Sequence, residues 1–140
     1  MPAIPRFSIH CDKHVGPGEF ADLMRAVGWG EGYAPDTVAR SLAAYPFIAH
    51  ARSAAGQLLG YVSAFSDRAF STMLGELVVD PGHARRGIGR ALLATVEAEF
   101  PGVPVYVKPL GEAHHFFRAC GYKPPCTPMQ VLFKRNATPA

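Results

Sequence analysis

A strand, a turn rich in glycine and arginine, and the start of a helix follow one another without interruption between residues 77 and 100. The apolar run at 77–79 stops at Asp80-Pro81-Gly82, a combination that ends strands. From residue 87 to residue 100, apolar side chains recur at three- and four-residue steps, the period of a helix with one buried face. This junction places a helix N-terminus directly after a strand, with the helix packed on a sheet.

The turn at 85–90 reads Arg-Arg-Gly-Ile-Gly-Arg. A helix N-terminus offers unpaired backbone N–H groups at the positive end of the helix dipole, and glycines let a phosphate approach the backbone. The arginines add permanent charge and paired donors. The turn therefore predicts a pyrophosphate site made by Arg85, Arg86, Gly87, Ile88, Gly89 and Arg90. The alternative is a basic surface turn whose glycines serve only its geometry.

The rest of the 140 residues alternates between strand and helix patterns, and no linker or repeat divides the chain, so we expect one domain over 1–140. Strands are predicted at 7–10, 47–52, 57–65, 71–79, 103–108, around 122 and at 129–134, and helices at 19–27, 35–45, 87–100 and 111–120. Antiparallel pairing followed by crossovers through helices predicts an α/β fold with a mixed, mostly antiparallel sheet of about six to seven strands and about four flanking helices.

Composition excludes several other classes of protein. The chain is 49% hydrophobic and 18% charged, which rules out a disordered or fibrous protein, and no apolar run approaches the ~20 residues of a membrane span. The N-terminus lacks a signal-peptide pattern, and three widely spaced cysteines fit a reducing compartment. We therefore expect a cytoplasmic protein without a membrane partner. A net charge of +3 without interleaved aromatic and basic residues predicts no nucleic-acid partner.

Three segments together resemble the GNAT superfamily of acyl-CoA-dependent N-acyltransferases. They are Leu-Val-Val-Asp-Pro at 77–81, Arg-Arg-Gly-Ile-Gly-Arg-Ala-Leu-Leu at 85–93 and Phe-Phe-Arg-Ala-Cys-Gly-Tyr at 116–122. With Gly87 and Gly89 as the glycines of the family pattern Gln/Arg-x-x-Gly-x-Gly/Ala, Ala84 stands where Gln or Arg is expected. A register from Arg86 to Ala91 also matches the letters, but it misplaces the helix relative to the strand. The resemblance covers nearly the whole chain and implies a GNAT-like domain whose turn at 85–90 binds the pyrophosphate of CoA.

Acyl transfer to an amine requires a base, because an alkyl amine with a pKa near 10.4 is protonated at neutral pH. Glu76, on the same strand face as Val78, is the candidate base, and a solvated or salt-bridged glutamate is the alternative. Asp67 is a second candidate, although a turn-capping aspartate is the commoner role there. The resemblance implies that the N–H of Leu77 stabilises the oxyanion and that the pantetheine arm pairs along Leu77, Val78 and Val79.

The segment at 111–120 carries two phenylalanines, Phe116 and Phe117, that either line the pantetheine tunnel or fill the core. Many relatives have a tyrosine where Phe117 stands, which protonates the departing thiolate, and an asparagine where Leu110 stands. This chain has neither group. The remaining candidates for the acid are His115, Cys120 and Tyr122, with solvent as the alternative.

Acceptor recognition is assigned to the glycine-rich segment after the first helix. Trp29 and Tyr33 are the candidate lining of an amine pocket, and a core position is the alternative for Trp29. Carboxylates at 31, 36, 67 and 76 favour a cationic amine.

No metal is expected. His10, Cys11 and His14 lack a second ligand pair with zinc-site spacing, and His114 and His115, as neighbours on a helix, are not expected to face one ion.

The expected function is therefore N-acetyl transfer from acetyl-CoA, as co-substrate, to a primary amine. Attack is direct, in a ternary complex without a covalent intermediate, because no thiol has a base at a recognisable spacing. A small-molecule amine is favoured over a protein, and the fold is compatible with a homodimer. The alternative is a catalytically silent acyl-CoA sensor or interaction module, motivated by Ala84, Leu110 and Phe117.

Overall fold

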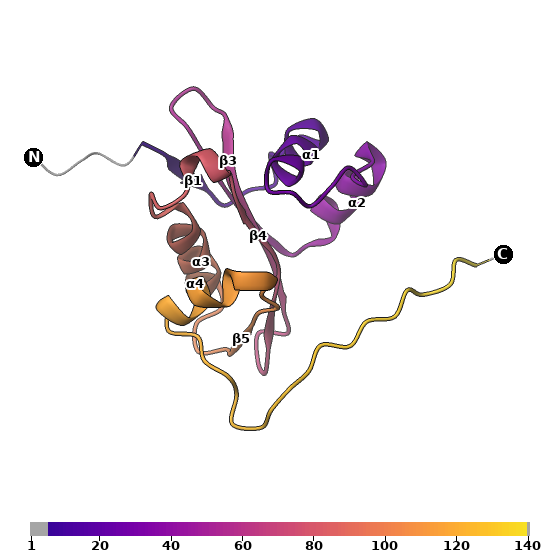
Figure 1. The fold of residues 1–140 in the computed structure, drawn as a ribbon, viewed down its shortest axis with the longest axis vertical. Helices are drawn as coiled ribbons and strands as arrows, with labels where there is room; N and C mark the ends of the chain where they lie inside the picture. The colour runs from indigo at the N-terminus through magenta and orange to yellow at the C-terminus, as the bar shows by residue number, and fades with distance from the viewer. Residues whose placement is uncertain (1–5, 140) are drawn as a thin grey trace, which may run out of the picture. The chain divides into compact units, whose positions relative to one another are not determined.

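The computed structural model describes residues 6–139, which form two compact units, one ending at Val107 and one beginning at Lys108 (Figure 1). The helices of the first unit are α1 (Pro17–Ala26), α2 (Pro35–Ala44) and α3 (Ile88–Glu99), with a 3₁₀ turn, η1, at Pro81–His83. Its strands are β1 (Ser8–His10), β2 (Phe47–Arg52), β3 (Leu58–Ser66), β4 (Thr72–Val79) and β5 (Val105–Tyr106). The second unit contains the 3₁₀ turn η2 (Gly111–Ala113) and α4 (His114–Ala119).

The sheet has the strand order β1-β2-β3-β4-β5. The pairs β1/β2, β2/β3 and β3/β4 are antiparallel, and β4/β5 is parallel. This confirms the mixed, mostly antiparallel α/β fold. Across residues 6–139 no helix has the length and apolar character needed to cross a membrane.

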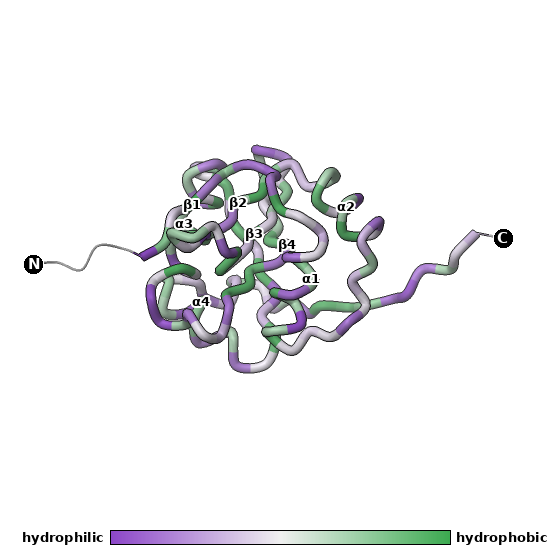
Figure 2. Tube along the Cα trace, turned by 90° about the horizontal axis from the view of Figure 1, so that it is seen from above, coloured by the Kyte–Doolittle hydropathy of each residue, from purple (hydrophilic) through white to green (hydrophobic). Residues whose placement is uncertain are grey.

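The strand count differs from the prediction, since the described part of the chain has five strands. Residues 120–139 contain no strand, although Met129, Val131, Leu132 and Phe133 are apolar and exposed there. Figure 2 shows this short hydrophobic stretch followed by a hydrophilic one. A strand forms only where a neighbour completes its hydrogen-bond ladder, and the apolar pattern alone cannot supply that neighbour.

The two faces of the sheet carry different helices (Figure 1). α1 and α2 cover one face, where Phe20, Leu23 and Leu42 pack with Tyr61 and Val78 of the strands. Both helices begin with proline at the first helical position, and both have apolar side chains spaced four residues apart, which form one buried face. α3 covers the opposite face, which we call the α3 face.

A bulge between β3 and β4 changes which face the β4 side chains occupy. Val62 pairs with Leu77 but Ala64 pairs with Leu74, so Ser63 lies opposite two residues, Gly75 and Glu76. Before the bulge, Leu74 lies on the α3 face. After it, the even-numbered residues Glu76 and Val78 lie on the face covered by α1 and α2.

A polar network joins β1, β2 and α1. His50, which is buried, donates from Nε2 to Asp12 Oδ1 at 2.7 Å and accepts at Nδ1 from Arg52 Nε at 3.0 Å. Arg52 also pairs with both carboxylate oxygens of Glu19. The hydrogen bonds from His50 and from the His14 N–H lower the pKa of Asp12 to about 2. The network therefore favours the ionised form of Asp12.

We predict that Asp12→Asn reduces the pH dependence of the free energy of unfolding at acid pH. The folded-state pKa of Asp12 is about 2, below the ordinary value of 3.8, so the ionised carboxylate stabilises the fold above about pH 4. This stabilisation is lost as the pH falls from about 4 to about 2. Urea midpoints measured across that window test the prediction. Asp36→Asn, on the exposed surface of α2, is the control and should keep the wild-type slope.

Candidate functional site

The turn between β4 and α3 is exposed and rich in unpartnered donors. Arg85 (φ 64°) and Gly87 (φ 84°) both have left-handed backbone, which turns the chain from η1 into α3. Gly87 is the N-cap of this 12-residue helix and provides no side-chain cap. The first helical bond runs from Ala91 N to Gly87 O, so the amides of Ile88 and Gly89 have no carbonyl partner within the helix. They face outward at the positive end of the helix dipole.

Arg85 and Arg86 extend this donor set into solvent. Both side chains are exposed, and within residues 6–139 neither forms an ion pair or a hydrogen bond. Buried Ile88 anchors the other side of the turn. An anion at this turn would meet main-chain amides and two uncompensated guanidinium groups.

Gly60 sets how closely the first turn of α3 approaches the sheet. A Cβ at this position would lie 2.9 Å from Ile88 Cγ2, 3.0 Å from Leu92 Cδ1 and 3.1 Å from the Val78 carbonyl oxygen. The N-terminus of α3 therefore rests directly on the backbone of β3. Gly60 is not among the candidate residues indicated by the sequence motifs, although a lone glycine inside an apolar strand indicates such a close approach.

On one side β4 pairs with β3 along its whole length, but on the other side it is paired only at its start. β5 pairs with Thr72 and Met73, and beyond Met73 no strand in the described chain continues the ladder on that side. Asp80 N donates to Leu59 O at 2.8 Å, and hydrogen-bonded positions alternate along an antiparallel pair. The register therefore directs the N–H groups of Leu77 and Val79 toward this open edge, whereas that of Val78 points to β3.

The Glu76 carboxylate lies on the other face of β4 and is held by hydroxyl groups. Ser63 Oγ accepts from Glu76 N at 2.9 Å and donates to Glu76 Oε2. Tyr45 donates from its hydroxyl to Glu76 Oε1 at 3.4 Å. Among residues 6–139 no lysine or arginine forms an ion pair with Glu76, so the salt-bridged alternative does not apply.

Gly75 makes these contacts possible. A Cβ on Gly75 would lie 2.5 Å from Ser63 Oγ and would also overlap the Tyr45 phenol. Any larger residue would displace the groups that hold Glu76. The bulge and its glycine thus fix the orientation of the carboxylate.

Three tyrosines surround the carboxylate. Burial raises the pKa of Tyr33, Tyr45 and Tyr61, and the Glu76 charge raises each of them further. Their hydroxyls therefore stay protonated at neutral pH. That of Tyr45 donates to Glu76, whereas the buried hydroxyl of Tyr61 has no hydrogen-bond partner within residues 6–139. Tyr33, which the sequence analysis placed in the acceptor pocket, thus lies within electrostatic range of Glu76. Trp29 is 39% exposed, which contradicts a core position for it.

Asp67 is engaged in the turn after β3. Its Oδ1 accepts from the N–H groups of Ala69, Phe70 and Ser71 at 2.9, 2.8 and 3.1 Å. These bonds lower the pKa of Asp67. The carboxylate has the turn-capping role, and its low proton affinity suits a base poorly.

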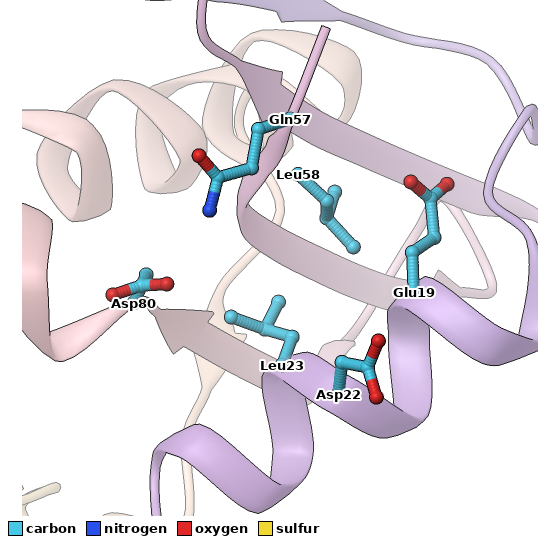
Figure 3. Close-up of a pocket in the computed structure, with 6 residues that line it drawn as sticks. All are labelled: Glu19, Asp22, Leu23, Gln57, Leu58 and Asp80. Atoms are coloured by element: carbon cyan, nitrogen blue, oxygen red, sulfur yellow. The ribbon is translucent and has the colours of Figure 1, made fainter.

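A hollow lies where α1 meets the ends of β3 and β4 (Figure 3). It has a volume of about 200 Å³ and is lined by Glu19, Asp22, Leu23, Gln57, Leu58 and Asp80. Glu19 pairs with Arg52, Asp22 pairs with Arg25 at 2.9 Å, and Asp80 accepts from Gly82 N at 2.8 Å. All three carboxylates already have partners inside the protein, so we assign this hollow no reacting group.

The second unit holds the two phenylalanines of the sequence analysis. Phe117 is buried. The centroid of its ring lies 5.2 Å from the centroid of the Phe116 ring and 5.6 Å from that of the Tyr122 ring, and both pairs are edge to face. This geometry gives Phe117 a packing role within the unit. His115 is a candidate acid, and its Nε2 lies 2.8 Å from Oε2 of Glu112.

Comparisons with known proteins agree with this arrangement. Residues 44–124 match the model of the acetyltransferase (GNAT) domain. A GNAT-family acetyltransferase from Streptococcus pneumoniae TIGR4 is 22% identical, with 92% of this chain and 99% of that chain covered and a TM-score of 0.74. A GNAT-family protein from Xanthomonas campestris pv. campestris is 23% identical, with 96% of both chains covered and a TM-score of 0.77. These structures show the shared fold.

A shorter likeness connects the chain to a mycothiol acetyltransferase from Clavibacter sepedonicus. It is 69% identical over 32 residues, which is 23% of this chain and only 10% of that protein. The family model, in contrast, covers more than half of the chain. The chain therefore belongs to the GNAT family of acetyltransferases and is an acyltransferase.

Proposed function

We propose that this acyltransferase moves an acetyl group from acetyl-CoA to a primary amine on a small molecule, with residues 1–140 acting as one domain in the cytoplasm. The single observation that carries the proposal is the position of two groups on consecutive residues of β4. The Glu76 carboxylate lies on the α1/α2 face, and the Leu77 N–H points to the open edge.

Acetyl-CoA would bind along the open edge of β4 and over the turn that follows it. The pyrophosphate would take the amides of residues 85–90 and the charge of Arg85 and Arg86, while the pantetheine arm pairs with the N–H of Val79. The side chain of Val78 is buried, so it would contribute through backbone position alone. The tunnel-lining role of Phe116 and Phe117 stays an expectation from the family resemblance.

The reaction needs a proton acceptor and an oxyanion donor. Glu76 takes a proton from the ammonium group, and the neutral amine attacks the thioester carbonyl carbon. The carbonyl oxygen gains charge as the C–N bond forms, and the Leu77 N–H donates to it. The C–S bond then breaks, the CoA thiolate leaves and takes a proton from solvent, and the amide nitrogen releases its extra proton to solvent.

The surroundings of Glu76 favour a cationic acceptor. An ammonium group would meet one carboxylate without a paired cation, together with the phenols of Tyr33 and Tyr45. Aromatic rings and a carboxylate both stabilise a cation. Trp29, partly exposed, is proposed to line the same acceptor site with Tyr33.

The chemistry is tested by following free thiol release from acetyl-CoA with a panel of amines that includes polyamines, arylalkylamines and aminoglycosides. We expect release that requires an amine and saturates with it. An acyl-CoA sensor would instead bind CoA in calorimetry without any amine-dependent release. The sensor alternative rests on the missing hydroxyl of Phe117 and on Ala84, and binding without release would overturn the proposed acetyl transfer.

A further inference from the structure

The second unit brings three metal-ligating side chains together outside the acetyl-transfer site. Glu112, His114 and His115 each offer a ligand atom, and these atoms all lie within 4.8 Å of one another. The residues come from η2 and the first turn of α4. Residues three apart lie on the same side of a 3₁₀ or α-helical turn. Glu112 and His115 have this spacing, and Glu112 Oε2 lies 2.8 Å from His115 Nε2.

The two imidazole rings lie side by side despite their adjacent positions in the sequence. Their centroids are 4.0 Å apart, with 39° between the ring planes. The expectation that neighbouring histidines would not face one ion is therefore wrong about the placement of the rings. The three ligand atoms now lie within 4.8 Å of one another, and small side-chain rotations would bring them to the spacing required around one ion.

Hydrogen bonding prepares His114 for a metal. Its Nδ1 lies 3.0 Å from the carbonyl oxygen of Gly111, which can only accept, so Nδ1 carries the proton. This tautomer leaves the lone pair of Nε2 available. A ligating histidine ordinarily has its other ring nitrogen fixed by a carbonyl or a carboxylate in this way.

The other histidine cluster shows the contrast. His50 uses Nε2 for Asp12 and Nδ1 for Arg52, so both of its ring nitrogens are occupied within the fold. In the second unit, in contrast, the Glu112 carboxylate and His115 Nε2 contact each other in an exposed position where an ion can enter.

We propose that Glu112, His114 and His115 form a site for a divalent transition-metal ion of the zinc type, with water in the remaining position. Two imidazoles and a carboxylate suit such an ion, and they suit Mg²⁺ or Ca²⁺ poorly. The ion would take the place of the hydrogen bond between His115 Nε2 and Glu112 Oε2, and any displaced proton would go to solvent. The proposal uses no group of the acetyl-transfer reaction, so it does not depend on the proposed function.

The test is calorimetric titration of the chelator-treated full chain with ZnCl₂ alone. We expect saturable binding of one ion per chain at pH 7.5, weakened about tenfold or more in His115→Gln and in Glu112→Gln. His14→Gln, a substitution of an exposed histidine after β1, should bind as the wild type does.

Zinc can also bind cysteine, and the chain has three free cysteines. Titration with NiCl₂, followed by the NMR signals of the histidine rings, separates the two cases. Selective shifts of His114 and His115 support the site. Binding that persists unchanged in His115→Gln, or the absence of binding in the wild type, overturns it.

Discussion

Glu76→Gln is expected to lower kcat for acetyl transfer by about 10²-fold to 10⁴-fold at neutral pH, the range typical of a lost general base. Glutamine has nearly the shape of glutamate, and its carbonyl oxygen can still accept from Ser63. It cannot accept a proton from the ammonium group. The substitution therefore removes the proton transfer and keeps the contact with Ser63, whereas the amide NH2 group cannot accept from Tyr45.

The pH dependence distinguishes a base from a binding residue. As the pH rises toward the amine pKa near 10.4, a growing fraction of the amine is already neutral, so the deficit of the variant should shrink. A deficit that stays constant across the pH range, or a wild-type rate at neutral pH, contradicts the assignment. Glu97→Gln, which changes an exposed glutamate on α3, is the matched control and should keep the wild-type profile.

Gly60→Ala is expected to raise the Kd for acetyl-CoA about tenfold or more, with a smaller effect on the KM of the amine. The added methyl would lie 2.9 Å from Ile88 and 3.0 Å from Leu92, inside contact distance. Overpacking of this kind typically costs about 1–3 kcal/mol and is relieved by moving backbone. The groups that must give way are the side chains of Ile88 and Leu92 and the Val78 carbonyl, and Ile88 belongs to the first turn of α3, which carries the outward amides.

Calorimetry with CoA and a thermal melt measure the two consequences separately. The control is Gly18→Ala, because a Cβ at Gly18 meets nothing within 4 Å. Alanine in that helix should leave CoA binding unchanged and stabilise the fold slightly. If Gly60→Ala bound CoA as tightly as the wild type, the turn at 85–90 would lose its role as the pyrophosphate site.

Local patterns predicted most of the first unit well. The strand predicted at 47–52 matches β2, and the helix predicted at 87–100 is α3 to within one residue at each end. Helical periodicity and capping residues act over a few positions, so the sequence displays them directly. The segment at 129–134 shows the limit of this reasoning, because its apolar pattern is not paired as a strand in the structure.

The glycine-arginine turn was visible for the same reason, since an N-terminal anion site needs only a strand end, glycines and a helix start in succession. The candidate base was also identified from its place on the strand. Its partners were not, because Ser63 and Tyr45 are 13 and 31 residues away from Glu76 in the chain.

The sequence by itself determined the elements, the family resemblance and the turn at 85–90. The tertiary structure decided which face of the sheet Glu76 occupies, that Ser63 and Tyr45 hold it, and that Gly60 supports α3. The physical reason is that one extra residue in a strand reverses every later side chain, and only pairing with a distant strand reveals where that residue sits.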